Sequence, residues 1–533
     1  MLNRQCLWYG LVSVLLITTP LCADTSANTS QPDIVLFLAD DVGWQDSSVP
    51  FWYPTNGAHP RRTPLNERYQ TPNQMRMAEE GMLFSAAYAS PVGSPTRVSL
   101  LTGMNAARHA VTTTVTTVDA KALVQKDDVL TEAVWACNGL QPPETKASGV
   151  TRSVFNCPNV KYPATEPVAY TLQQSYCCAQ TLPMLLKGVG YYSILAGKSN
   201  FGAGNGFNAT DVVTPGQNPY LLGFDFEEDV ALDRATIVLT REALKAADMQ
   251  ESTRPLFLYL SHFAPQKGDG EPIALREAPE DGLPWNMEEQ RYCDFIQTLD
   301  VSLGEVLDWA FDRKARTGRD VLVIFMGDNG SCLRECSGAT VLNAPLRGGR
   351  GSCYEGGIRV PLLVWMTGKV KAGVASHTPV ISEDIFSTIL DYAGLEEVSP
   401  LECAQTPAEV SVCGQLRSQK IDGVSLRKLL EEPRVRELSR VILTHYPHSG
   451  RPGFMTALRM GEWKLIWNHA TGEKELYNVV SDISEEKNQA KKRPSLVAKL
   501  SREMSRLLRE RGAQLPKLKG VPIALPDNGA HHN

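Results

Sequence analysis

The 533-residue chain lacks an excess of positive charge. Its 53 Lys and Arg residues face 59 Asp and Glu residues, so the formal net charge is -6. A nucleic-acid-binding protein needs a positive surface for the phosphate backbone, so no nucleic-acid partner is expected. The remaining composition, 43% hydrophobic and 21% charged residues, is that of a globular protein. Its length suits one large domain and a smaller one.

The N-terminus lacks an apolar run long enough to span a membrane comfortably. Residues 11–18 are mostly apolar, Arg4 precedes them, and Leu21-Cys22-Ala23 is an acceptable cleavage site. A spanning helix needs about 20 apolar residues, whereas a shorter run with these flanks is typical of a secretory signal. We expect residues 1–23 to be a signal peptide and the protein to be exported (periplasmic or secreted), without stable membrane insertion. An uncleaved N-terminal anchor is the alternative.

The chain also lacks paired Cys-x-x-Cys units, so a structural zinc site is not expected. It does contain 12 cysteines, ten of them beyond the signal region, including Cys293 and Cys353. An even number in an exported chain indicates disulfides. Cys403 and Cys413 flank a short loop and are plausible partners, but the connectivity stays open.

Four apolar runs alternate with helical patterns, which predicts an α/β fold: a large, mostly parallel sheet sandwiched by helices. The runs are 34–38, 192–195, 256–260 and 321–325, and the helical segments are 74–80, 181–187, 236–247 and 287–311. Polar residues follow each run. Because ligands of such sheets bind beyond the carboxyl ends of the strands, these residues are predicted to form one site.

The chain divides into a main domain and a smaller C-terminal part. We expect the α/β domain to cover residues 32–400, with a Cys-containing insertion at 113–180 that breaks the strand–helix rhythm. Residues 436–512 are expected to form a small α+β subdomain with an antiparallel sheet. Its helix, 494–510, repeats Leu496, Leu500, Met504 and Leu507 at helical spacing, which is typical of packing. Residues 513–533 are expected to be a loose tail.

Two pairs of oxygen-bearing residues follow predicted buried strands: Asp40-Asp41 and Asp328-Asn329. Carboxylate and amide oxygens suit a hard divalent cation, with Ca²⁺ the first choice and Mg²⁺ the second. Each pair alone is as typical of a helix cap or turn. Two pairs at the ends of two strands favour a metal site. Neither pair has a histidine beside it, which disfavours zinc.

Five motifs occur in order between Asp33 and Asn488, and together they resemble the sulfatase family, of the alkaline phosphatase superfamily. They are Ala39-Asp40-Asp41-Val42-Gly43, Ser94-Pro95-Thr96-Arg97 through Thr102-Gly103, Gly197-Lys198, Gly327-Asp328-Asn329-Gly330, and Pro345-Leu346-Arg347-Gly348 through Val360-Pro361. The resemblance implies a family activity of sulfuric ester hydrolysis. It also matches Asp40, Asp41, Asp328 and Asn329 to the Ca²⁺ ligands of the family.

The family's nucleophile is missing from this sequence. In the sulfatase motif, Cys or Ser stands four residues before the Arg and is oxidised to formylglycine, which attacks sulfur. Here that position is Gly93, four residues before Arg97. Glycine has no side chain to oxidise. Ser94 stands one residue out of register, and we expect it to cap the helix that begins there rather than to replace the nucleophile. The resemblance places Arg97 beside the metal, and a structural Arg is the alternative.

Three further positions depart from the family pattern. Lys198 is kept, but Asn200 and Gln266 stand where the family has histidines, and Arg350 replaces a lysine. Asn and Gln cannot transfer protons near neutral pH, whereas His can. His262 lies near one of these positions, and we expect it to be structural rather than a substitute.

These observations favour a sulfatase-family protein that binds a sulfated small molecule or saccharide with little or no hydrolysis, a pseudoenzyme. The alternative is an active sulfuric ester hydrolase with a mechanism that does not use formylglycine. A phosphatase or phosphodiesterase relative would need a hydroxyl group at position 93. The sequence sets neither the oligomeric state nor the identity of the ligand.

Overall fold

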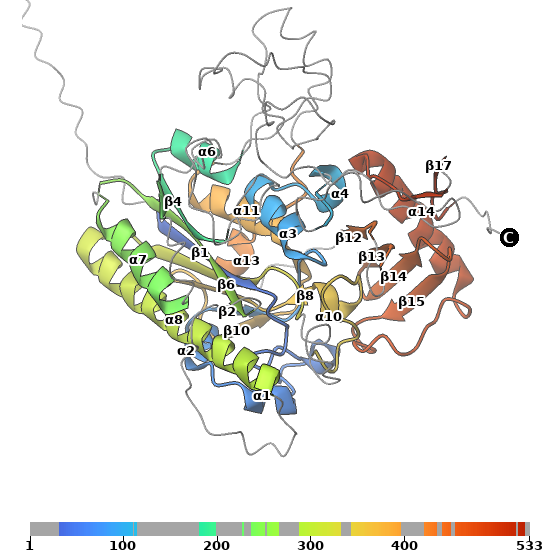
Figure 1. The fold of residues 1–533 in the computed structure, drawn as a ribbon, viewed down its shortest axis with the longest axis horizontal. Helices are drawn as coiled ribbons and strands as arrows, with labels where there is room; N and C mark the ends of the chain where they lie inside the picture. The colour runs from blue at the N-terminus through green and yellow to red at the C-terminus, as the bar shows by residue number, and fades with distance from the viewer. Residues whose placement is uncertain are drawn as a thin grey trace, which may run out of the picture.

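An eight-stranded sheet lies at the centre of the main part of the molecule in the computed structural model (Figure 1). The strand order is β10-β2-β9-β7-β1-β6-β4-β5. The bounds are β1 Asp33–Asp40, β2 Met82–Phe84, β4 Tyr192–Gly197, β5 Phe226–Glu228, β6 Leu256–Pro265, β7 Val321–Gly327, β9 Leu362–Met366 and β10 Val374–Ser376. The structure describes residues 31–109, 111–113, 181–198, 226–228, 236–250, 253–265, 287–331, 343–395, 420–433, 440–448, 453–518 and 521–527.

The sheet is mostly parallel, as the sequence predicts. Strands β7, β1, β6, β4 and β5 pair in parallel, and β10 pairs in parallel with β2. Only β9 runs against its neighbours, β7 and β2. The four apolar runs of the sequence are the strands β1, β4, β6 and β7.

Helices cover both faces of this sheet (Figure 1), and this explains the continuous apolar runs. Successive side chains of a strand point to opposite faces. In β1, Ile34, Leu36 and Leu38 belong to one buried cluster, while Val35, Phe37 and Ala39 belong to another. The helices nearest the first cluster are α3 Gly93–Thr102, α6 Leu182–Gly188 and α11 Ser382–Tyr392, and those nearest the second are α2 Pro72–Glu80, α7 Thr236–Asp248 and α8 Met287–Thr317.

Strand register brings the carboxyl ends of β1, β7, β6 and β4 together. Ala39 is paired with Gly327, and Leu38 with Ser261. Ser261 is also opposite Gly197. The residues that follow these strands therefore meet at one edge of the sheet.

A second, antiparallel sheet forms the C-terminal part, drawn in red at the right of Figure 1. Its order is β12-β13-β14-β15, and Leu500, Met504 and Leu507 of the helix α14 are buried against it. The bounds are β12 Val441–Tyr446, β13 Met455–Met460, β14 Trp463–Asn468, β15 Lys474–Asn478 and α14 Pro494–Arg511. These elements match the predicted antiparallel sheet and packed helix.

The described part of the segment after residue 512 is not loose, contrary to our expectation. It forms a short hairpin of β16 Lys517–Leu518 and β17 Val521–Pro522. Ile523 is buried with the core of the C-terminal sheet, and the Lys474 Nζ donates to the Pro526 carbonyl at 2.6 Å. Apolar residues of the tail therefore pack into the hydrophobic core formed by the small sheet and α14.

Short elements connect these layers. They are the 3-10 helix η1 Pro54–Asn56, the helices α1 Pro64–Arg68, α4 Ala106–His109, α10 Glu355–Ile358 and α13 Arg427–Glu431, and the strands β3 Ala87–Tyr88, β8 Arg359–Val360 and β11 Val380–Ile381. The three strands form a separate small sheet in the order β11-β3-β8.

The cysteines and the membrane prediction can be compared with the structure only in part. Cys293 and Cys353 are buried thiols, so the expectation of disulfides is wrong for these two. The other cysteines, the insertion from residue 114 to 180, and the signal segment 1–23 lie outside the described residues. Among the residues that are described, no helix combines the length and apolarity needed to cross a membrane.

Candidate functional site

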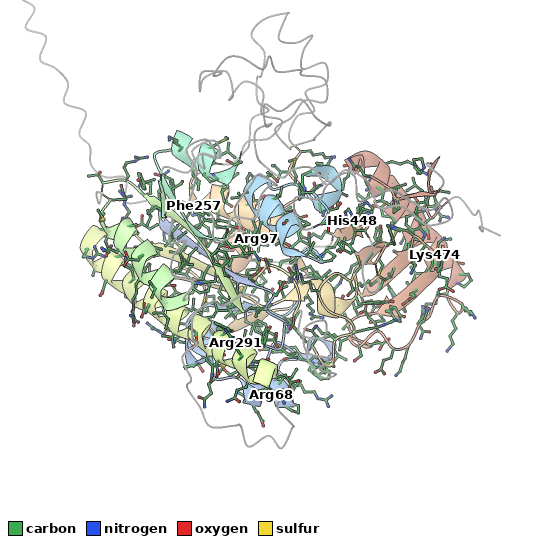
Figure 2. All side chains as sticks on the ribbon, viewed as in Figure 1. Arg68, Arg97, Phe257, Arg291, His448 and Lys474 are labelled. Atoms are coloured by element: carbon green, nitrogen blue, oxygen red, sulfur yellow. The ribbon has the colours of Figure 1, made fainter. Side chains whose placement is uncertain are left out.

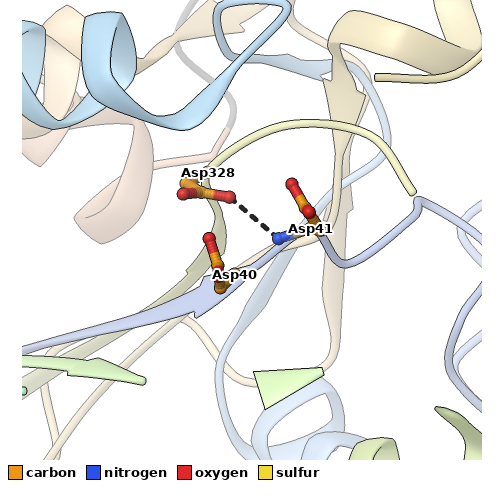
Figure 3. Close-up of side chains that lie close together, drawn as sticks. All are labelled: Asp40, Asp41 and Asp328. Carbon is orange, nitrogen blue, oxygen red and sulfur yellow. Dashed lines mark hydrogen bonds between the residues drawn. The ribbon is translucent and has the colours of Figure 1, made fainter. Parts of the chain in front are cut away.

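Three carboxylates meet at the edge of the sheet where β1 and β7 end. We call Asp40, Asp41 and Asp328 the acidic cluster. Asp40 is the last residue of β1, and Asp328 follows β7 directly (Figure 3). One oxygen from each carboxylate lies within 4.8 Å of the others, and all three residues are at most 2% exposed. The structure therefore brings these three side chains together at one edge of the sheet.

The backbone of Asp41 adopts a left-handed conformation, with φ of 63°. Such a conformation costs a residue with a side chain roughly 1–2 kcal/mol, and Asp tolerates it better than most. The turn aims the Asp41 amide at Asp328 Oδ1, to which it donates at 2.9 Å (Figure 3). The Asn329 amide group donates to Asp41 Oδ1. Asp41 is thus tied to both residues that follow β7.

Arg97 crosses from α3 to the acidic cluster and is fully buried near the centre of the molecule (Figure 2). Its Nε and one terminal nitrogen donate to Asp328 Oδ2 at 3.1 and 2.8 Å. The other terminal nitrogen donates to the Lys198 carbonyl at 2.8 Å and to Ser261 Oγ. A guanidinium suits this task because its planar donors serve several acceptors at once.

Two further cations border the cluster. The Lys198 Nζ lies 2.6 Å from Asp40 Oδ2, and the Arg350 Nε lies 3.4 Å from Asp41 Oδ1. The side chains of Lys198 and Arg350 are 13% and 23% exposed, whereas the acidic residues are sealed. Solvent therefore reaches the site from the side on which these two cations lie.

The three carboxyl groups differ in their affinity for protons. Burial raises the pKa of Asp40 to about 7, although Lys198 opposes the shift. Burial also raises the pKa of Asp41, against the pull of Arg350. Burial acts on Asp328 in the same direction, but Arg97 and Lys198 outweigh it and hold its pKa below the usual value. Asp328 is accordingly the member of the cluster that keeps its negative charge most firmly.

Position 93 faces the acidic cluster directly. Gly93 is the first residue of α3. A Cβ atom at this position would lie 2.4 Å from Asp328 Oδ2 and 3.5 Å from Arg97 Nε. A side chain here would point at the cluster, and the Asp328 carboxylate would have to shift to admit it.

The donor set of the site fits a hard divalent cation. Among the residues that the structure describes, Asp41 Oδ2 and Asn329 Oδ1 are buried oxygen atoms without a hydrogen-bond partner. Buried polar atoms usually have a partner, and each one that lacks it costs about 1–3 kcal/mol. Oxygens with unused lone pairs beside three carboxylates are what a cation with an oxygen shell requires.

Several residues singled out by the sequence are placed elsewhere or not placed. Asn200 and Gln266 lie outside the described residues. Ser94 is not the helix cap that we predicted, because α3 begins one residue earlier and Val92 precedes it in an extended conformation. The buried His262 ring packs against the ring of Phe37, with the ring centroids 4.5 Å apart, and its Nε2 lies 3.4 Å from Thr240 Oγ1.

The sequence analysis missed two residues that contact the site. Ser261 accepts from Arg97, and the only signal for it is that it follows the apolar run 256–260. The Tyr292 hydroxyl donates to the Asp41 carbonyl at 3.0 Å. Tyr292 lies on α8, whose pattern is that of an ordinary amphipathic helix. The neighbouring sequence therefore gives no signal that Tyr292 contacts the site.

Comparison with known proteins establishes the family. The sulfatase family model matches residues 32–133 and 151–395, more than half of the chain. The chain therefore belongs to the sulfatase family, whose activity is the hydrolysis of sulfuric esters.

Curated relatives agree with this assignment. The chain is 27% identical to N-acetylgalactosamine-6-sulfatase of Mus musculus over 395 residues, which cover 72% of this chain and 67% of the relative. The human protein of that name is 28% identical, and 62% of it is covered. A sulfatase of Formosa agariphila is 23% identical over 541 residues, with 90% of this chain and 89% of the relative covered. The chain thus matches about two thirds of the mammalian relatives' length.

Solved structures share the fold. The crystal structure of Ps i-CgsB in complex with k-i-k-neocarrahexaose has a TM-score of 0.60 and 22% identity, with 93% of this chain and 95% of that chain covered. The structure of BT4656 in complex with its substrate D-glucosamine-2-N,6-O-disulfate has a TM-score of 0.55 and 15% identity, with 90% and 98% covered. Both confirm the predicted α/β architecture.

Proposed function

We propose that this sulfatase-family chain binds a divalent cation and a sulfated saccharide at the acidic cluster, with little or no hydrolysis of the sulfuric ester. The observation that carries the proposal is Gly93. The position faces Asp328 and Arg97, where the resemblance places the formylglycine nucleophile. With hydrogen in place of a side chain, the chain offers no group there to attack sulfur.

The cation of the proposal is Ca²⁺, with Mg²⁺ as the second choice. Asp40, Asp41, Asp328 and Asn329 would hold it, and the two buried oxygens without partners support this set. A bound Ca²⁺ supplies concentrated positive charge for an anionic oxygen of the ligand. Four oxygen donors with no nitrogen or sulfur among them match Ca²⁺ chemistry better than that of zinc.

The anion of the proposal is the sulfate group, held by Arg97, Lys198 and Arg350. All three border the acidic cluster, and Lys198 and Arg350 lie on its solvent side. Proton transfer is the weak point, because Asn200 and Gln266 stand at positions where the family has histidines and neither titrates near neutral pH. A site of this composition binds but lacks the groups for turnover.

The proposed ligand class comes from the names of similar proteins and from the ligands in similar structures. Relatives are named for a sulfated hexosamine, and structural neighbours were solved with a neocarrahexaose and with a glucosamine disulfate. We propose a sulfated saccharide by analogy. The proposal retains export through a signal peptide at 1–23, an α/β domain at 32–400 and a small subdomain at 436–512.

Calorimetry with a defined pair of sugars tests the binding half of the proposal. D-Glucosamine-2-N,6-O-disulfate is titrated into the protein with Ca²⁺ present, and unsulfated glucosamine is the control. Saturable heat from the disulfate alone supports the proposal. Equal heat from both sugars, or no heat from either, would contradict the proposal that the site binds a sulfated ligand.

An activity assay tests the other half. We expect the pure protein with Ca²⁺ to cleave an aryl sulfate no faster than Asp328→Ala does. Cleavage far above that control would establish an active hydrolase that works without formylglycine. Gly93→Cys, made in a host that oxidises the cysteine, should recover little activity, because Asn200 and Gln266 remain and Asp328 obstructs the new side chain.

A further inference from the structure

A buried carboxylate outside the acidic cluster has no part in the proposed function so far. Asp46 is 0% exposed, and the groups that contact it in the described part of the chain are neutral donors. Tyr69 donates its hydroxyl to Asp46 Oδ1 at 3.0 Å, and Tyr292 and the Gly43 amide donate to Oδ2, both at 2.7 Å. Burying a carboxylate without a cation is costly unless such donors surround it.

Gly43 allows this carboxylate to lie directly beneath the loop that follows Asp41. A Cβ atom at position 43 would lie 2.5 Å from Asp46 Oδ2, so a side chain there would displace the carboxylate. Asp46 is therefore held close under the turn by the lack of a side chain at Gly43 and by the donors around it. Burial raises its pKa despite these hydrogen bonds.

Tyr292 links this carboxylate to the acidic cluster. Its hydroxyl lies 2.7 Å from Asp46 Oδ2 and 3.0 Å from the carbonyl oxygen of Asp41, and its single proton is shared between these two acceptors. Ser331 Oγ lies 3.3 Å from the same hydroxyl. The hydroxyl comes from α8, the helix on which Arg291 is labelled in Figure 2. Asp46 thus orients a hydroxyl that contacts the backbone of Asp41.

The Asp41 peptide is the part of the cluster that most needs such support. Asp41 has the left-handed φ of 63°, and this turn sends its amide toward Asp328, while Asp41 Oδ2 has no partner in the described part of the chain. A residue in a sparsely populated conformation persists only where its surroundings hold it. The Tyr292 hydroxyl is the contact that holds the carbonyl side of this residue.

We propose that Tyr292, anchored by Asp46, is a positioning residue for the cation ligand Asp41. The inference rests on the proposed function, because it concerns the cation of the same site. In this proposal, Tyr292 is neither a cation ligand nor a contact of the saccharide. It holds the Asp41 backbone in the conformation that presents the free lone pairs of Oδ2 to the cluster. Partners of metal ligands characteristically change metal affinity by about 10–100-fold when they are removed.

Tyr69 provides a matched control within the same chain. It donates to the same carboxylate as Tyr292 does, and both residues are buried. Replacing either tyrosine with phenylalanine keeps the ring and removes one donor from Asp46. The Tyr69 hydroxyl donates to Asp46, whereas the Tyr292 hydroxyl also contacts Asp41.

The experiment compares Ca²⁺ binding by the full chain, Tyr292→Phe and Tyr69→Phe, using calorimetric titration with Ca²⁺ alone. We expect Tyr292→Phe to raise the Ca²⁺ Kd about tenfold or more, and Tyr69→Phe to leave it unchanged. Melting temperatures without Ca²⁺ should fall by similar amounts in the two variants. A Kd that is equal for Tyr292→Phe and the unaltered chain overturns the inference, as does an equal rise in both variants.

The outcomes separate this inference from the proposed function. If the unaltered chain binds no Ca²⁺, the proposed cation site is wrong and the role of Tyr292 falls with it. If the unaltered chain binds Ca²⁺ and Tyr292→Phe binds it equally well, only the role of Tyr292 is wrong. Should Tyr292→Phe not fold, Asp46→Asn tests the same link by removing the charge that anchors the hydroxyl. A raised Kd in that variant supports the assignment, and an unchanged Kd overturns it.

Discussion

Two of the buried charge groups in the described part of the chain differ in their access to solvent. The acidic cluster lies at the edge of the large sheet. The other group, which we call the Glu355 network, consists of Glu355, Arg359, Lys464 and Glu485. The Lys464 Nζ lies 2.8 Å from Glu355 and 2.9 Å from Glu485. The Arg359 guanidinium lies 3.2 Å from Glu355.

The carboxyl groups of the two groups respond to burial alike, but their cations differ in exposure. Cations outweigh burial at Glu355, whose pKa falls to about 2, and at Asp328, whose pKa lies below its usual value. Burial outweighs the cations at Glu485 and at Asp40, whose pKa values both rise to about 7. The Lys464 side chain is 1% exposed, whereas that of Arg350 is 23% exposed.

This difference separates a structural charge group from a binding site. The Glu355 network is sealed from solvent, and it joins α10 of the main part to β14 of the small sheet. At the acidic cluster, Asp41 Oδ2 and the adjoining Asn329 Oδ1 have no hydrogen-bond partner among the described residues, and the neighbouring cations Lys198 and Arg350 reach solvent. A buried charge group is therefore a candidate site when its polar atoms remain unsatisfied and a path to solvent exists.

The largest effect is expected from breaking the Glu355 network. Lys464→Met leaves two buried carboxylates without their shared cation, which should lower the free energy of unfolding by about 3–5 kcal/mol. Denaturant unfolding measures the loss. Lys499→Met, at an exposed position, is the control and should change little. A loss no larger than that of the control would show that the network is not structural.

The next effect concerns the acidic cluster. A ligand at 100 times its Kd stabilises a protein by about 2.7 kcal/mol, and Asp328→Ala should abolish this gain for Ca²⁺ because it removes the most firmly charged ligand. The melting temperature with and without Ca²⁺ measures it. Asp320→Ala is the control, since Asp320 precedes β7 at its opposite end and pairs with Lys314. If Ca²⁺ shifts the melting temperature of Asp328→Ala as much as that of the unaltered chain, Asp328 is not a ligand of the cation.

Acid acts on a further buried group, His262, which belongs to neither charge group. Burial lowers the pKa of His262 to about 3, whereas an unfolded chain has a value near 6.5. The folded protein leaves this imidazole neutral, so its contribution to stability is full above pH 6.5 and is lost as the pH falls toward 3. The slope is about 1.4 kcal/mol per pH unit. His262→Asn should reduce the slope of stability against pH between 6 and 4 by about this amount.

The Glu355 network supplies the contrast for that measurement. The lowered pKa of Glu355 means that its contribution is present above pH 4.5 and is lost only as the pH falls through about 2. Acid between pH 6 and 4.5 should therefore leave this carboxylate charged. A slope that persists unchanged in His262→Asn would assign the acid sensitivity to other groups.

The smallest effect is expected from charges at the surface. Arg506 pairs with Glu503 and Glu510 on α14, but its side chain is 56% exposed. Exposed pairs are screened by water, so Arg506→Ala should change the free energy of unfolding by less than about 1 kcal/mol. The same denaturant experiment measures it. A loss as large as that of Lys464→Met would break the distinction between buried and exposed charge groups.

Much of the fold and half of the site could be predicted from local patterns. The apolar run 34–38 predicts β1 because a strand covered on both faces needs apolar residues at every position. The meeting of Asp40, Asp41 and Asp328 follows from the common edge at which parallel strands end. Patterns of this kind are local, and each needs only a few neighbouring residues.

Other features could not be predicted, because they depend on contacts between distant segments. The start of α3 at Gly93 reflects the extended conformation of Val92 rather than a capping side chain at Ser94. The tail contacts the small sheet through Ile523, and no periodic pattern in the sequence predicts this contact. Tyr292 lies on a long amphipathic helix, where a buried tyrosine is indistinguishable from an ordinary core residue.

The sequence alone determined which chemical groups are available: a hydrogen at position 93, oxygen donors after two strands, and cations at 97, 198 and 350. The tertiary structure decided which of these groups meet. Pairing of β1 with β7 places Asp41 beside Asp328, which is 287 residues away along the chain. Local propensity cannot specify such a pairing, because the register between strands is set by hydrogen bonds and side-chain packing across the whole sheet.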